Sequence, residues 1–90
     1  MFVNIGNAEM VNEKDIIGFF DFDSTTVSKR TRQYLERAEK KGDVKNVAFD
    51  IPKTFIVTAK GKDKQTVFFS QLSTATLTKR AEENIGIAEL

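Results

Sequence analysis

The run from Ile16 to Phe22 constrains the fold more than any other, because it places five large apolar residues within seven positions. These residues are Ile16, Ile17, Phe19, Phe20 and Phe22. They occupy both even and odd positions, whereas a strand with one solvated face alternates apolar and polar residues. The run therefore predicts a β-strand whose sheet needs apolar cover on both faces.

The length of 90 residues predicts a single domain over residues 1–90. A domain this small leaves a large share of its surface in water, and the sequence contains no cysteine that could form a disulfide. Either the core is efficient, or further copies of the chain complete it.

Shorter β-rich runs lie on both sides of this segment. They are Phe2–Ile5, Met10–Val11 as a brief extended piece, Thr54–Ala59 and Thr66–Ser70. Residues 60–64, which include Gly61, indicate a hairpin turn between the last two. Residues 43–53 are expected to form a loop or an irregular edge, with Pro52 at the start of the following strand.

A central helix is predicted after the Ile16–Phe22 strand. Its apolar stripe follows the 3.6-residue period of a helix and consists of Val27, Thr31, Tyr34, Leu35 and Ala38. A hydroxyl group in the segment 24–26 is expected to cap its first turn. Gly42 is expected to take the left-handed position beyond its end.

A C-terminal helix is expected to begin after the N-cap Ser73, with Leu72 and Leu77 spaced as a hydrophobic staple. The sequence thus predicts an α+β fold, in which a small, mostly antiparallel β-sheet carries one central α-helix and one C-terminal α-helix. A helix pair can hide one face of such a sheet. We expect a second copy of the chain to hide the other face, so that oligomerisation completes the sheet.

The composition excludes several classes of function. The chain has neither histidine nor cysteine, so it lacks the commonest general base, the commonest transition-metal ligand and any thiolate metal site. No apolar run approaches the ~20 residues that cross a bilayer, and the first ten residues do not resemble a signal peptide. We expect a cytoplasmic protein without a cofactor, a membrane contact or a small-molecule substrate.

One short motif suggests catalysis. Asp21-Phe22-Asp23 follows an apolar strand and resembles the nucleophile loop of haloacid-dehalogenase-type phosphatases, in which two aspartates flank one residue. The chain lacks the second acidic pair of those enzymes and is too short for their doubly wound sheet. The alternative interpretation is structural: the two aspartates end a strand, and Asp23 or Ser24 starts a helical turn.

The basic residues concentrate in the middle of the chain. The net charge is +1, but residues 29–64 hold eleven lysines and arginines against five acids. Arg30, Arg32 and Arg37 belong to the central helix. Clustered cations of this kind bind phosphates by releasing counterions, but they also occur on ordinary solvated helix faces, and both interpretations stay open.

Four strings spread over residues 1–82 resemble the small bacterial extracellular matrix regulator family of RemA and RemB, and they are more similar to RemB-type members. The strings are Asn4-Ile5-Gly6, Lys14 to Asp21, Pro52 to Thr58 and Ser70 to Ala81. The resemblance implies a non-enzymatic cytoplasmic regulator of biofilm matrix genes. It also implies assembly into an oligomer, possible as a ring, and DNA as a partner.

RemA-type chains bind DNA through arginines that precede their second and third strands. Lys14 and Lys53 occupy the corresponding positions here, and a lysine offers a point charge in place of the bidentate fork of arginine. The resemblance, together with the basic helix, therefore gives Lys14, Arg30, Arg32, Arg37 and Lys53 as candidate DNA contacts. The alternative is a self-assembling protein-interaction module without affinity for nucleic acid.

Overall fold

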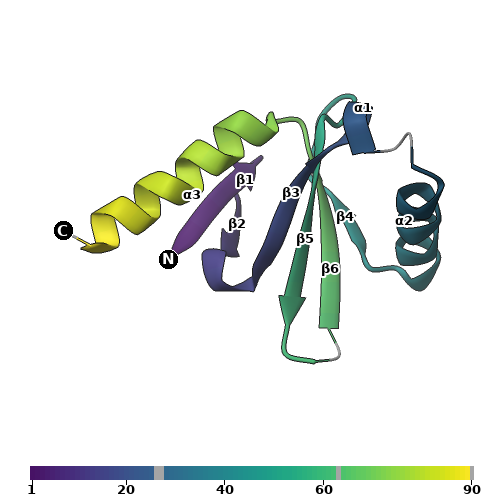
Figure 1. The fold of residues 1–90 in the computed structure, drawn as a ribbon, viewed down its shortest axis with the longest axis horizontal. Coiled ribbons are helices and arrows are strands. Elements are labelled where there is room, and N and C mark those ends of the chain that lie inside the picture. The colour runs from purple at the N-terminus through teal and green to yellow at the C-terminus, as the bar shows by residue number, and fades with distance from the viewer. Residues whose placement is uncertain (26–27, 63, 90) are drawn as a thin grey trace.

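The computed structural model describes residues 1–25, 28–62 and 64–89, with side chains up to residue 82. Figure 1 shows the order of its elements. They are β1 (Phe2–Gly6), β2 (Glu9–Asn12), the 3-10 helix η1 (Glu13–Asp15), β3 (Ile16–Asp21), α1 (Phe22–Thr25), α2 (Lys29–Lys41), β4 (Val44–Asn46), β5 (Thr54–Lys60), β6 (Lys64–Ser70) and α3 (Thr74–Glu89).

The central sheet has four strands in the order β3-β5-β6-β4. The β3–β5 and β5–β6 pairs are antiparallel, whereas β4 runs parallel to β6. Strands β1 and β2 form a separate antiparallel hairpin. This arrangement confirms the predicted α+β class with a mostly antiparallel sheet, a central helix and a C-terminal helix.

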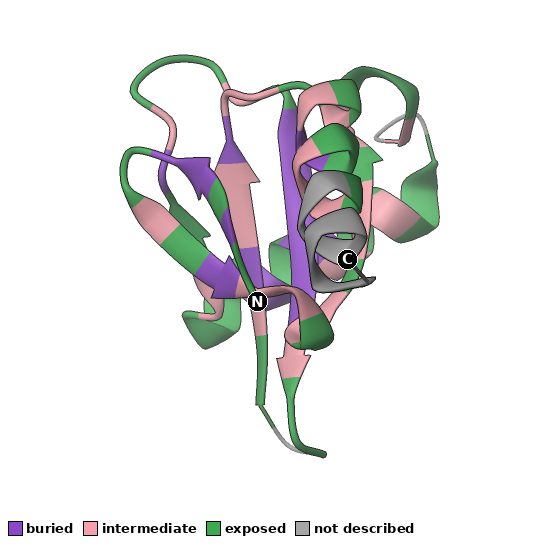
Figure 2. Ribbon diagram, turned by 90° about the vertical axis from the view of Figure 1, so that its left-hand side faces the viewer, coloured by how far each residue is buried: buried purple, intermediate pink, exposed green. Residues whose placement is uncertain are grey.

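One face of the central sheet is covered by the β1–β2 hairpin together with α3 (Figure 1). The buried side chains of this layer come from all three units and include Val3, Ile5, Val11, Ile56 and Leu77. Figure 2 shows the buried stretch along the middle strands beneath α3. The hairpin was predicted only as isolated strands, and it provides apolar cover that the helices alone could not supply.

The opposite face of the sheet is covered by α2. Leu35 and Ala38 from the helix are buried against Phe55, Val57 and Val67 of the sheet. Neighbouring residues Phe55 and Ile56 therefore face opposite layers, which confirms that the sheet has apolar side chains on both faces. The two long helices lie on opposite sides of the sheet and do not form a pair on one face. The protomer itself therefore supplies cover on both faces, where a second copy was expected to hide one of them.

The start of α2 differs from the prediction. The helix begins after Ser28, whose side chain makes no capping hydrogen bond. The segment 22–25 instead forms the separate short helix α1, because the Asp21 carboxylate accepts hydrogen bonds from the backbone N–H groups of Asp23 (2.8 Å) and Ser24 (3.3 Å). Val27 and the proposed cap at residue 26 lie outside the described residues.

The ends of several elements agree with the prediction. Gly42 ends α2 with a left-handed φ of 77°, and its N–H bonds to the Ala38 and Glu39 carbonyl oxygens. The Ser73 hydroxyl accepts from the Thr76 N–H at 3.2 Å and caps α3. Among the described residues, no helix combines the length and the apolar character that a membrane span requires.

Strand β4 was not predicted, because the segment 43–53 was expected to be irregular. Its three residues pair with Val67 to Phe69 of β6 in parallel register. The remainder of the segment, from Val47 to Lys53, is a loop. A run as short as Val44-Lys45-Asn46 carries no apolar period of its own, so only its partner strand defines it.

Candidate nucleic-acid interface

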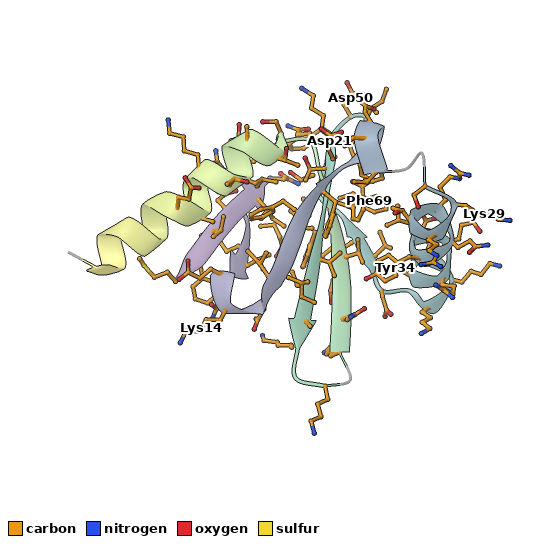
Figure 3. All side chains as sticks on the ribbon, viewed as in Figure 1. Lys14, Asp21, Lys29, Tyr34, Asp50 and Phe69 are labelled. Atoms are coloured by element: carbon orange, nitrogen blue, oxygen red, sulfur yellow. The ribbon has the colours of Figure 1, made fainter. Side chains whose placement is uncertain are left out.

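The helix α2 carries the densest group of cations in the described structure. Its 13 residues include six lysines or arginines and two glutamates. All six basic side chains are exposed, since the buried face of the helix consists of Leu35 and Ala38. Figure 3 shows Lys29 on the side of α2 that points away from the sheet. The helix is therefore held by its apolar stripe and presents cations to solvent.

Four of the six basic residues of α2 lie on its two flanks, and the other two lie on its outer face. At 100° per residue, Arg30, Arg37 and Lys41 fall on one flank of the helix, and Arg32 lies on the other. The same flank borders the sheet, because Arg30 lines one groove there while Arg37 and Lys41 line the next. Lys41 was not among the predicted contacts, although its spacing of four and eleven residues from the two arginines could have revealed it.

Tyr34 lies between these cations, where α2 meets the sheet (Figure 3). Its hydroxyl donates a hydrogen bond of 3.2 Å to the Gln65 side-chain oxygen of β6. Burial raises the pKa of the Tyr34 hydroxyl above its usual 10.0, and the negative charge of Asp43 adds to the shift. The neutral phenol thus joins α2 to the sheet and separates the two grooves.

Lys14 and Lys53 do not join the helix cations within one protomer. Lys14 belongs to η1 at the start of β3, whereas Lys53 precedes β5 at the opposite end of that strand. Six residues of β3 separate these ends, which corresponds to about 20 Å. The five predicted contacts therefore occupy three separate places, and only an assembly of several copies could bring them onto one surface.

The backbone on both sides of Lys53 is firmly held. Its N–H donates to the Ser70 carbonyl oxygen at 2.9 Å, and its carbonyl oxygen accepts from the Phe22 N–H at 3.0 Å. The Lys53 side chain is exposed. The cation therefore projects from a fixed point beside α1, close to the acidic residues Asp21 and Asp23.

The α2 cover leaves an apolar groove open at the β3 edge of the sheet. The groove has a volume of about 370 Å³. Ile17 is 60% exposed there and Phe20 is 36% exposed. The Phe20 ring stacks on Phe55 with a centroid separation of 5.2 Å, and Arg30 supplies the only charged side chain among the described residues that line the groove.

The loop from Val47 to Lys53 is the second exposed apolar feature. Phe49 is 75% exposed and Ile51 is 80% exposed. The Phe49 N–H donates to the Gln71 side-chain oxygen at 3.0 Å, and the Val47 N–H donates to the Phe69 carbonyl oxygen at 2.9 Å. Neither residue was predicted as functional, because a loop has no periodicity that marks an apolar side chain as exposed.

The aspartate motif has a structural role in the molecule. β3 ends at Asp21, as the structural interpretation predicted, although the residue that caps the turn is Asp21 itself. The Thr25 hydroxyl also bonds back to the Asp21 carbonyl oxygen. Within the described ranges, no group of three acidic side chains is placed to hold a metal ion.

Comparisons with known proteins find a matching family model and a similar bacterial protein. The family model described as "RemA-like: Extracellular matrix regulatory protein A-like" matches residues 2–81, which include α2 and the loop from Val47 to Lys53. Extracellular matrix regulatory protein B of Bacillus subtilis (strain 168) is 32% identical over 82 residues. That match covers 91% of this chain and 91% of the relative.

Proposed function

Because the chain belongs to the RemA-like family, we propose that it is a non-enzymatic regulator of extracellular matrix gene expression that acts in the cytoplasm as a homo-oligomer. In this proposal the oligomer contacts duplex DNA through copies of the basic helix α2. Each copy contributes a few phosphate contacts, and their fixed spacing allows weak contacts to add up.

The exposed basic flank of α2 is the observation that supports DNA as the partner. Arg37 and Lys41 lie about 6 Å apart along the helix axis, and Arg30 lies about 10 Å from Arg37. A row of cations on a rigid element suits the regularly spaced charges of a nucleic-acid backbone. The contacts involve backbone phosphates and carry no sequence information by themselves.

Fluorescence anisotropy with a labelled 30-base-pair duplex tests this proposal at two salt concentrations. The wild-type protein is expected to bind at 50 mM salt and to lose affinity steeply at 200 mM. The Arg37→Ala/Lys41→Ala variant is expected to bind more weakly. The slope of the logarithm of its binding constant against the logarithm of the salt concentration is expected to be shallower by about 0.9 per lost phosphate contact.

The matched control is Lys62→Ala/Lys79→Ala, which removes the same charge from exposed positions outside α2. Equal weakening in both variants would show that net charge, not the α2 flank, governs the affinity. Absence of binding by wild-type protein at 50 mM salt would contradict the DNA contact altogether.

A protein-interaction module without affinity for nucleic acid is the second candidate. The exposed Phe49 and Ile51 side chains favour it, because large apolar side chains held outward by a hydrogen-bonded loop mark protein contacts. The separation of Lys14 from Lys53 favours it too. An oligomer that fails to bind duplex DNA at either salt concentration would support this alternative.

A further inference from the structure

We propose that the Phe49–Ile51 loop of one copy inserts into the apolar groove between β3 and α2 of the next copy. The inference rests on the proposed oligomer and identifies the two surfaces that form its interface. One surface is a protrusion with two apolar side chains, and the other is a recess lined by Ile17, Phe20, Arg30, Tyr34, Phe55 and Val57.

The protruding surface is already ordered before any contact is made. The Asp50 side chain accepts a hydrogen bond of 2.8 Å from the Ile51 N–H, and the Asn46 side chain accepts one of 2.9 Å from the Ala48 N–H. With Phe49 tied to Gln71, the loop is fixed at several points. Little conformational entropy is lost when such a loop docks, and a buried Phe contributes a large apolar area.

The receiving groove has the matching chemistry. Its lining is predominantly apolar, and Ile17 and the Phe20 ring are open to solvent. Although α2 covers the middle of that face, Ile17 and Phe20 at the β3 edge stay exposed in the protomer. An apolar side chain from a neighbour would complete the packing around Phe20 and Phe55.

The loop and the groove carry opposite charges, which favours the loop of a second copy as the occupant of the groove. Asp50 lies between Phe49 and Ile51 in the loop, and Arg30 borders the groove. When the two apolar side chains enter the groove, the Asp50 carboxylate comes close to the Arg30 guanidinium at the edge of the groove. In this arrangement Arg30 belongs to the protein interface, and Arg37 and Lys41 remain available to phosphates.

The two surfaces are separate on the protomer, so one copy cannot fill its own groove and a neighbour must supply the loop. Asp50 lies beyond the end of β5 that carries Thr54 (Figure 3). The groove extends toward Ile17 and Val57, further along the sheet. An interface between unlike surfaces is heterologous. Repetition of it in one direction produces a closed ring or an open filament, whereas reciprocal exchange of the loops between two copies produces a symmetric dimer.

Size-exclusion chromatography with light scattering tests the pairing through complementation. The Phe49→Ser/Ile51→Ser variant removes the two apolar side chains of the loop. The Ile17→Lys variant places a long charged side chain in the groove, and the fold should tolerate it because Ile17 is exposed in the protomer. Each variant alone is expected to run as a monomer, whereas an equimolar mixture is expected to form a heterodimer through its one intact interface. Circular dichroism checks that both variants are folded.

A charge exchange tests the Asp50–Arg30 contact separately. Asp50→Arg and Arg30→Asp are each expected to raise the dissociation constant of the assembly by about tenfold or more, since like charges meet at the interface. The combined variant is expected to recover most of the wild-type affinity. If either residue had only a structural role, the combined variant would not recover the wild-type dissociation constant.

Met10→Ser is the matched control, because Met10 is 48% exposed and lines a different groove beside Phe2 and Lys64. Dissociation caused by Met10→Ser but not by Ile17→Lys would overturn the inference, as would an unchanged oligomer in the loop variant or a monomeric wild type. DNA anisotropy is measured independently, so DNA binding by a wild-type monomer would reject this interface and retain the DNA contact.

Discussion

The Ser70 hydroxyl donates a buried hydrogen bond of 2.6 Å to the Ile5 carbonyl oxygen, 65 positions away in the chain. The Ser70 hydroxyl oxygen in turn accepts a hydrogen bond of 3.0 Å from the Leu72 N–H. One side chain thus joins the end of β6, the β1–β2 hairpin and the approach to α3. The string from Ser70 to Ala81, on which the family resemblance rests, contains residues that hold the fold together.

Ser70→Ala is expected to lower the free energy of unfolding by about 1–3 kcal/mol, because it removes a buried hydroxyl that serves as both donor and acceptor. Urea denaturation followed by circular dichroism measures the change. Thr78→Ala, at an exposed position of α3, serves as the control and is expected to change stability by less than about 0.5 kcal/mol. A loss of equal size in both variants would contradict a specific role for Ser70.

Arg80→Ala is expected to loosen the contact between α3 and the hairpin. The Arg80 guanidinium donates a hydrogen bond of 2.8 Å to the Asn4 carbonyl oxygen, and a partly exposed bond of this kind contributes about 1 kcal/mol. Hydrogen exchange of the β1–β2 amides is expected to accelerate in Arg80→Ala and to stay unchanged in Lys79→Ala, whose side chain points to solvent. Identical exchange in the two variants would disprove the link.

Gly42→Ala is expected to destabilise the protein by about 1 kcal/mol, because residue 42 adopts a left-handed backbone with φ of 77° that an L side chain disfavours. A Cβ atom at this position would meet nothing within 4 Å, so the cost comes from the backbone alone. Thermal unfolding compares it with Gln33→Ala on the exposed face of α2. A stabilised Gly42→Ala protein would show that the C-terminal turn can rearrange.

Tyr34 is expected to make stability fall in alkaline solution. Burial raises the pKa of its hydroxyl in the folded protein, so above pH 10 the unfolded chain loses this proton more readily than the folded chain does. The unfolded state then binds fewer protons, and stability decreases as the pH rises through that range. The effect fades as the pH falls below 10, because the phenol then becomes neutral in both states.

Urea denaturation of wild type and Tyr34→Phe between pH 8 and 11 isolates this contribution, because lysine titrations are common to both proteins. The stability difference between them is expected to shift in favour of Tyr34→Phe as the pH increases. A difference that is constant over the whole range would show that Tyr34 titrates alike in the folded and unfolded states.

The sequence alone determined the local structure and the need for cover on both faces of the sheet. The run from Ile16 to Phe22, the stripe that contains Leu35 and Ala38, and the end of α2 at Gly42 are all defined by neighbours along the chain. Side-chain periodicity and backbone φ preferences act over a few residues, so these features can be predicted from a single sequence. The family resemblance likewise rests on short strings.

The tertiary structure decided which distant residues meet. It showed that a hairpin covers one face of the sheet, that β4 pairs in parallel with β6, and that Lys14 and Lys53 stand at opposite ends of β3. It also exposed Phe49 and Ile51. These relationships depend on strand order and on the loops between elements, because distance in space between remote residues is set by topology and packing and has no local signature in the sequence.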